Sequence, residues 1–143
     1  MTRFKTDRDL VFAGDDLVRP RMTVEKEKLK QRFPGFEFYA KGGEVIAIKG
    51  WLNTNYGWRY KVRIDIPSDY PYSMPDISIV SQTIDSDCSH AYSDRDICVM
   101  KSDQWSSSLS LSFIVAKTAL WLNKYDVWRR NGKKRWPGTD QHR

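Results

Sequence analysis

Residues 59–66, RYKVRIDI, carry the clearest hydrophobic pattern in the sequence. Tyr60, Val62, Ile64 and Ile66 alternate without exception with charged side chains. Successive side chains of a β-strand point to opposite faces of its sheet, so this period of two predicts a strand with one apolar and one solvated face. A sheet with one solvent-exposed face is typical of antiparallel rather than parallel pairing.

Three further strands are predicted on either side of this stretch. Residues 36–40 alternate in the same way, and the turn Lys41-Gly42-Gly43 leads from them into an apolar run at 45–48. On the other side, a proline-rich corner at 67–75 precedes Ile77, Ile79 and Val80. The sequence therefore predicts a four-stranded antiparallel meander.

Helices are predicted before and after the meander. A short charged helix is expected from Thr23, whose hydroxyl can cap the first turn, to Arg32, just before Pro34-Gly35. Apolar residues at three- and four-residue steps predict a long helix over 109–131, closed by Gly132. This order gives an α+β fold, with residues 1–143 as one domain, an irregular N-terminal segment at 1–21 and a basic C-terminal tail at 132–143.

Composition excludes several classes of protein. Of the 143 residues, 40% are hydrophobic and 29% charged, which is the balance of a folded domain rather than a disordered chain. The longest nearly apolar stretch, 113–122, is shorter than a membrane span. Five of the first ten residues are charged, where a signal peptide would be apolar, so we expect a cytoplasmic protein that binds no membrane.

The net charge of +6 comes mostly from the end of the chain, where residues 124–143 hold seven basic and two acidic residues. Such a run is typical of a solvated helix end, and docking onto an acidic partner or nucleic acid is the alternative. Only Trp128 and Trp136 could supply aromatic platforms among these charges. We therefore do not expect nucleic acid as the main partner.

Residues 81–108 show no sustained periodicity, and an irregular segment of this length in a small domain is usually functional. It also holds the densest group of reactive side chains in the sequence: Cys88, His90, Tyr92, Asp94, Asp96 and Cys98.

Three chemistries fit these residues. Cys88, His90 and Cys98 could bind zinc, although a second close cysteine pair is missing. Cys98 and His90 could form the pair of a cysteine protease, or the thiol could carry an acyl group and pass it to an amine. Against all three, Cys98 in its apolar context could be a small buried side chain, and we expect a surface or spacer role for Cys88 between Asp87 and Ser89. No cofactor and no bound metal are expected.

Three motifs, in order, resemble those of ubiquitin-conjugating enzymes. Residues 66–77, IPSDYPYSMPDI, are similar to the family's Phe-Pro-x-x-Tyr-Pro-Phe-x-Pro-Pro-x-Val signature. Residues 90–99, HAYSDRDICV, resemble Asn-x-Tyr-x-x-Gly-x-Ile-Cys-Leu, and residues 104–111 resemble the Trp-Ser-Pro-x-Leu-Thr entry into a helix. The resemblance spans about 23–122 and implies the family's fold.

The resemblance also implies roles for individual residues. Cys98 stands where the family's cysteine forms a thioester with the carboxyl terminus of a ubiquitin-like protein. His90 replaces the asparagine that steadies the oxyanion, so it becomes a candidate oxyanion or orientation group. Asp94 and Asp96 are expected as loop acids near the acceptor amine, whereas Arg95 replaces a family glycine.

The closing Trp-Leu-x-x-Tyr-x-x-Trp pattern and the Trp136-Pro137-Gly138 ending resemble the stand-alone bacterial relatives of antiphage CBASS operons. That resemblance implies that the carried protein is a cyclic-oligonucleotide synthase, conjugated through its carboxyl terminus to an acceptor protein. An adenylation motif is missing from the sequence, so an activating enzyme is a further expected partner. The alternative is a protein-binding module of the same fold in which the cysteine is inert.

Overall fold

The alternating stretch at 59–66 forms an inner strand of an antiparallel sheet, as predicted. The structure is a computed structural model and describes residues 8–88 and 90–137. Strand β3 (Arg59–Asp65) buries Tyr60, Val62 and Ile64 almost completely. The residues between them are exposed or half-buried, so the predicted register is confirmed.

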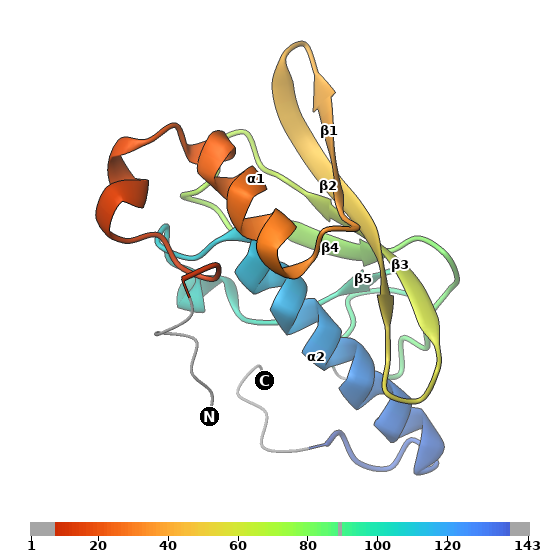
Figure 1. The fold of residues 1–143 in the computed structure, drawn as a ribbon. Helices are drawn as coiled ribbons and strands as arrows, with labels where there is room; N and C mark the ends of the chain where they lie inside the picture. The colour runs from red at the N-terminus through yellow and green to blue at the C-terminus, as the bar shows by residue number, and fades with distance from the viewer. Residues whose placement is uncertain (1–7, 89, 138–143) are drawn as a thin grey trace.

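Within the described residues the sheet has five strands, so the prediction of four was wrong. The strands are β1 (Glu37–Lys41), β2 (Glu44–Asn53), β3, β4 (Asp76–Ile79) and β5 (Asp96–Ile97), adjacent in sequence order and all antiparallel (Figure 1). Strand β5 lies in the segment predicted to be irregular and pairs Ile97 with Ile77. Two residues are too few to produce a recognisable alternation.

Helix α1 (Arg21–Arg32) begins earlier than predicted, because Pro20 rather than Thr23 occupies its N-cap position. Helix α2 (Leu111–Arg130) lies within the predicted range, and the Ser110 hydroxyl accepts a hydrogen bond from the Phe113 N–H. Gly132 ends α2 as expected: its φ of 81° is the left-handed conformation that glycine adopts most easily. Two short 3₁₀ helices complete the elements, η2 (Gly14–Val18) and η3 (Ser102–Gln104).

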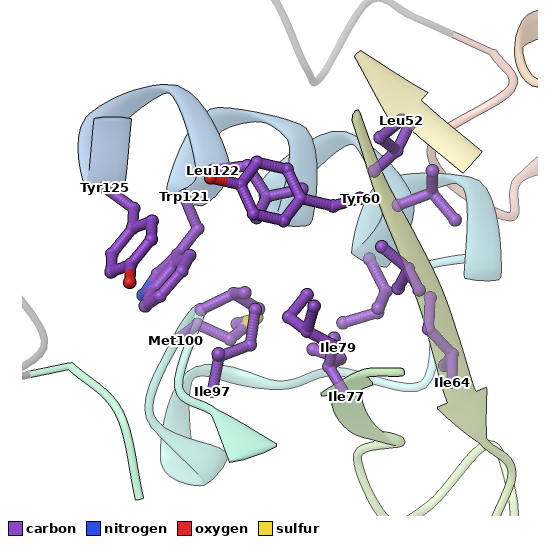
Figure 2. Packing of buried hydrophobic residues seen from close by; sticks show 14 of the residues in the cluster. Leu52, Tyr60, Ile64, Ile77, Ile79, Ile97, Met100, Trp121, Leu122 and Tyr125 are labelled. Atoms are coloured by element: carbon purple, nitrogen blue, oxygen red, sulfur yellow. The ribbon is translucent and has the colours of Figure 1, made fainter. Parts of the chain in front are cut away.

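Helix α2 packs across one face of the sheet and forms the main core with it (Figures 1 and 2). Tyr60 of β3 lies in this core and donates a hydrogen bond of 2.7 Å to Asp126 of α2. Ile97 and Met100, on either side of Cys98, belong to the same core. The backbone around Cys98 is therefore held by packing. Within the described residues, neither helix is long and apolar enough to cross a membrane.

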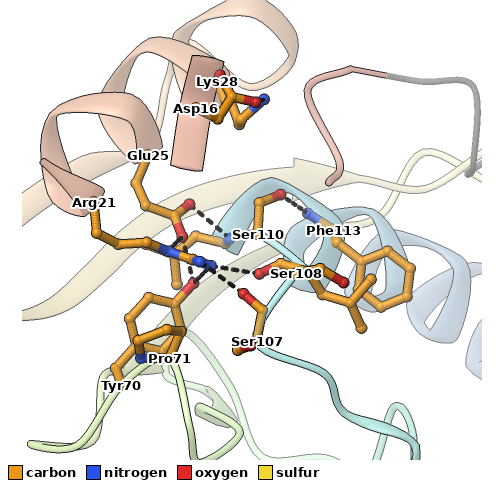
Figure 3. Close-up of polar contacts among 12 residues, drawn as sticks. Asp16, Arg21, Glu25, Lys28, Tyr70, Pro71, Ser107, Ser108, Ser110 and Phe113 are labelled. Carbon is orange, nitrogen blue, oxygen red and sulfur yellow. Dashed lines mark hydrogen bonds and ion pairs between the residues drawn. The ribbon is translucent and has the colours of Figure 1, made fainter. Parts of the chain in front are cut away.

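A buried polar network ties three parts of the chain together (Figure 3). Glu25 of α1 is fully buried, and its carboxylate accepts hydrogen bonds from Arg21 Nε at 3.0 Å, the Tyr70 hydroxyl at 2.5 Å and the Leu111 N–H at 2.9 Å. Arg21 also donates to the Ser107 carbonyl at 2.7 Å. This network fixes the proline-rich corner and the end of the irregular segment against α1.

The N-terminal segment and the basic tail both pack on the body where they are described. Leu10 and Phe12 are buried, and the Phe12 N–H donates to the Ser108 carbonyl at 2.6 Å. In the tail, Lys133 forms an ion pair with Asp85. Part of the tail therefore holds the irregular segment rather than extending into solvent; residues 138–143 lie outside the described range.

Candidate active site

Cys98 follows directly after β5, and its neighbours Ile97 and Val99 are both buried. Its own side chain is half-buried. The Cys98 N–H donates to the His90 carbonyl at 2.9 Å, and its thiol contacts the Met100 carbonyl at 3.5 Å. The backbone thus fixes the thiol in place while leaving it accessible, so Cys98 is not the fully buried side chain that its apolar neighbours also allowed.

The thiol opens into a pocket of about 420 Å³. Two pieces of chain line it, one before and one after β5. The lining residues are His90, Ala91, Tyr92, Cys98, Lys101, Ser102 and Asp103. The pocket therefore combines a nucleophile, hydroxyl groups, a cation and a carboxylate, which are the groups that acyl transfer uses.

Tyr92 interacts directly with the thiol. Its hydrogen bond with Cys98, together with desolvation and the negative charge of a Cys98 thiolate, raises the pKa of Tyr92 to about 12. The hydroxyl therefore keeps its proton at neutral pH. A protonated phenol beside the sulfur can donate a hydrogen bond to a thiolate and stabilise it.

Hydrogen bonds of the His90 main chain and a ring contact of its side chain fix this residue in position. Its N–H donates to the sulfur of Cys88 at 3.4 Å, and its carbonyl accepts both the Cys98 N–H and the indole N–H of Trp121, the latter at 3.2 Å. The buried imidazole packs against the Trp136 ring, with 4.9 Å between centroids. His90 and Cys98 are therefore brought together as expected, with a main-chain hydrogen bond between them.

Asp94 lies on the exposed turn before β5, and the exposed Asp96 is the first residue of β5. The Asp96 carbonyl accepts from the Tyr92 N–H at 2.8 Å, and the Ser93 hydroxyl accepts from the Asp96 N–H at 3.0 Å. The Asp94 carbonyl accepts from the Ile84 N–H at 2.8 Å. These main-chain contacts shape the turn, and neither carboxylate lines the Cys98 pocket.

The pocket contains residues that sequence reasoning did not select as catalytic: Tyr92, Lys101, Ser102 and Asp103. Tyr92 had a signal, since it matches the tyrosine of the family motif. Lys101, Ser102 and Asp103 had no such signal in the sequence, because only the turn from β5 into η3 brings them close to the thiol.

Cys88 was expected in a surface or spacer role, and the prediction of a surface position was wrong. Its side chain is 2% exposed and belongs to the main core. Polar neighbours in the sequence suggested exposure, but the turn that begins at Asp85 directs the thiol inward, where it accepts the His90 N–H. Among residues 8–88 and 90–137, no three His, Cys, Asp or Glu side chains are grouped as a metal site would require. The zinc alternative thus receives no support.

The comparison with protein families decides the classification. A family model described as Type II CBASS E2 protein matches residues 25–143. The chain belongs to this family. The match includes the proline-rich corner, the Cys98 pocket and α2. A comparison with the curated proteins found no match.

Membership confirms the resemblance stated from the motifs. An E2-like protein of a CBASS system is expected to act with a protein partner of that system, and the α+β structure is consistent with an E2-like fold. His90 and Arg95, where the sequence departs from the ubiquitin-conjugating motif, lie within the matched range.

Proposed function

We propose that the protein is a ubiquitin-conjugating-like acyl carrier. Cys98 forms a thioester with the carboxyl terminus of a partner protein and passes the acyl group to an amine. The observation that carries this proposal is an accessible thiol, fixed by its backbone, beside a tyrosine hydroxyl in a chain of the Type II CBASS E2 family. The carried protein is a cyclic-oligonucleotide synthase, and the acceptor is a second protein.

In the first step, the Cys98 thiolate attacks a carboxyl group that an activating enzyme has converted to a reactive acyl group. The new C–S bond forms, and the activating group leaves with the bonding electrons. Tyr92 stabilises the thiolate before the attack. Once the sulfur is acylated, the same hydroxyl is released from the thiolate and can donate to the developing oxyanion.

In the second step, the acceptor amine attacks the thioester carbonyl. The C–N bond forms, the C–S bond breaks, and Cys98 leaves as a thiolate. The amine must lose a proton, and Asp103 is the carboxylate that lines the pocket and can accept it. Asp94, on the turn before β5, and Asp96, at the start of β5, would hold the acceptor protein rather than contact the reacting atoms.

We assign His90 an orientation role. The Cys98 N–H is already bonded to the His90 carbonyl, so this amide is not available as an oxyanion donor. The imidazole packs on Trp136, which favours a fixed position for the ring. His90→Ala should slow transfer by roughly 10- to 1,000-fold, the range for losing one well-placed catalytic interaction.

The test is reconstitution with a cyclic-oligonucleotide synthase and an activating enzyme of the same CBASS system. Wild type should form an adduct with the synthase that a small thiol such as dithiothreitol releases by attacking the thioester, and Cys88→Ala should do the same. Cys98→Ser should give either no adduct or an ester that resists the thiol, because an oxyester replaces the thioester. A thiol-sensitive adduct on Cys98→Ser would contradict the proposal. Failure of folded wild type to form any adduct would favour the inert binding module.

A further inference from the structure

A second surface lies away from the Cys98 pocket, where the β2–β3 hairpin meets the last turn of α2. Three large aromatic side chains are unusually exposed there: Trp51 by 47%, Tyr56 by 43% and Trp58 by 48%. Arginines from the hairpin and from α2 accompany them. We call this surface the arginine–aromatic patch; it consists of Trp51, Tyr56, Trp58, Arg59, Arg129 and Arg130.

The guanidinium group of one arginine lies over each exposed ring of the patch. The guanidinium carbon lies 4.5 Å from the ring centroid for Arg59 over Trp51 and 4.6 Å for Arg130 over Tyr56. The third guanidinium, that of Arg129, lies 5.4 Å from the Trp58 ring. These distances are in the range of cation–π contacts.

Among residues 8–88 and 90–137, none of the three arginines of the patch forms an ion pair with an acidic residue. A guanidinium stacked on a ring still presents its N–H groups at its edge, where they can bind a carboxylate in a two-pronged arrangement. The patch therefore offers three positive groups with free hydrogen-bonding capacity.

The hairpin that carries the patch is firmly held. The Asn55 N–H donates to the Asn123 side chain of α2 at 2.8 Å, and the Thr54 N–H donates to the Trp58 carbonyl at 2.8 Å. The Thr54 hydroxyl accepts the Trp58 N–H at 3.2 Å. A surface ordered before binding loses little conformational entropy when a partner docks, which favours affinity.

We propose that the arginine–aromatic patch binds an acidic segment of a protein partner. Trp, Tyr and Arg are the residues that dominate the binding energy of protein interfaces, and all three are concentrated here. Carboxylates of the partner segment would provide the negative charge that pairs with the three arginines. Single-stranded nucleic acid fits less well, because bases stack on open ring faces and guanidinium groups already cover one face of each ring. The proposal does not depend on acyl transfer at Cys98, since no residue of the patch lines that pocket.

The test is fluorescence anisotropy with two labelled probes at physiological salt: a short peptide in which Glu alternates with Leu, and an oligothymidine. Wild type should bind the peptide more tightly than the oligothymidine. Arg129→Gln/Arg130→Gln should weaken peptide binding about 10-fold or more, the effect of losing interface residues that each contribute about 1 kcal/mol. Lys134→Gln/Arg135→Gln is the matched control, because it removes the same charge from the tail outside the patch.

Three results would overturn the proposal. Equal weakening by the two double variants would show that only net charge matters. Tighter binding of oligothymidine would assign the patch to nucleic acid. No binding of the peptide by wild type would leave the arginines with a purely structural role, holding the hairpin against α2. Circular dichroism of each variant verifies that the fold is intact.

Discussion

Replacing Glu25 with alanine should destabilise the protein by about 2 to 6 kcal/mol, because two buried donors lose their acceptor. The carboxylate is fully buried and accepts hydrogen bonds from Arg21, Tyr70 and Leu111. Arg21 keeps other acceptors, so most of the cost comes from the Tyr70 hydroxyl and the Leu111 N–H. Each unsatisfied buried donor costs about 1 to 3 kcal/mol.

Urea denaturation followed by tryptophan fluorescence measures this change. Glu27→Ala is the matched control, because Glu27 is an exposed residue of the same helix, paired with Arg19 at the surface, and its loss should leave the denaturation midpoint nearly unchanged. Glu25→Gln preserves the size of the side chain and one acceptor oxygen, so it should cost less than Glu25→Ala. A cost below about 1 kcal/mol for Glu25→Ala would refute this account of the network.

The pH dependence provides a second readout for Glu25. Burial raises the pKa of Glu25 above its ordinary value of 4.5, while its hydrogen bonds and Arg21 oppose the shift. The folded protein then binds this proton more tightly than the unfolded chain. The contribution of Glu25 to stability is therefore full below about pH 4.5 and falls as the pH rises through the raised pKa. The stability of wild type minus that of Glu25→Gln should decrease over this window; an increase would show that the ion pair outweighs burial.

The remaining predictions concern packing. A Cβ on Gly50 would lie 2.5 Å from the Phe36 ring, so Gly50→Ala should cost about 1 to 3 kcal/mol in urea denaturation, and a neutral effect would show that the ring can move freely. Ile64→Ala should cost about 2 to 5 kcal/mol and Arg63→Ala under about 1 kcal/mol, because only the first side chain is fully buried; the reverse order would contradict the register of β3. Trp136→Ala should lower stability by about 2 kcal/mol and also slow transfer, and unchanged transfer by the folded variant would separate this ring from the site.

The sheet and both helices could be predicted because their patterns are local. Residues 59–66 alternate without exception, and one buried face is all that such a strand requires. The start of α1 could not be placed, since Pro20 and Thr23 are both acceptable at helix starts and the choice depends on the rest of the fold. Strand β5 was not predicted, because it is only two residues long and its pairing with β4 joins residues far apart in sequence.

The site was predictable only where a motif marks it. Cys98 and His90 lie in a recognisable pattern, and the structure brings them together. Burial of Cys88 and the position of Asp103 depend on how turns direct their side chains, which neighbouring residues in the sequence do not reveal. Long-range contacts such as the Trp136 ring against His90 likewise have no local signal.

Peptide-resolved mass spectrometry of the reconstituted adduct identifies which cysteine carries the acyl group. Trypsin cleaves after Arg95 and Lys101, so Cys98 falls in the peptide at 96–101, while Cys88 falls in the preceding peptide. If Cys98 is the acyl carrier, the acyl group is found on the peptide at 96–101 and a thiol reagent removes it. An acyl group on the peptide that contains Cys88, or an unmodified Cys98 in a confirmed adduct, would contradict it.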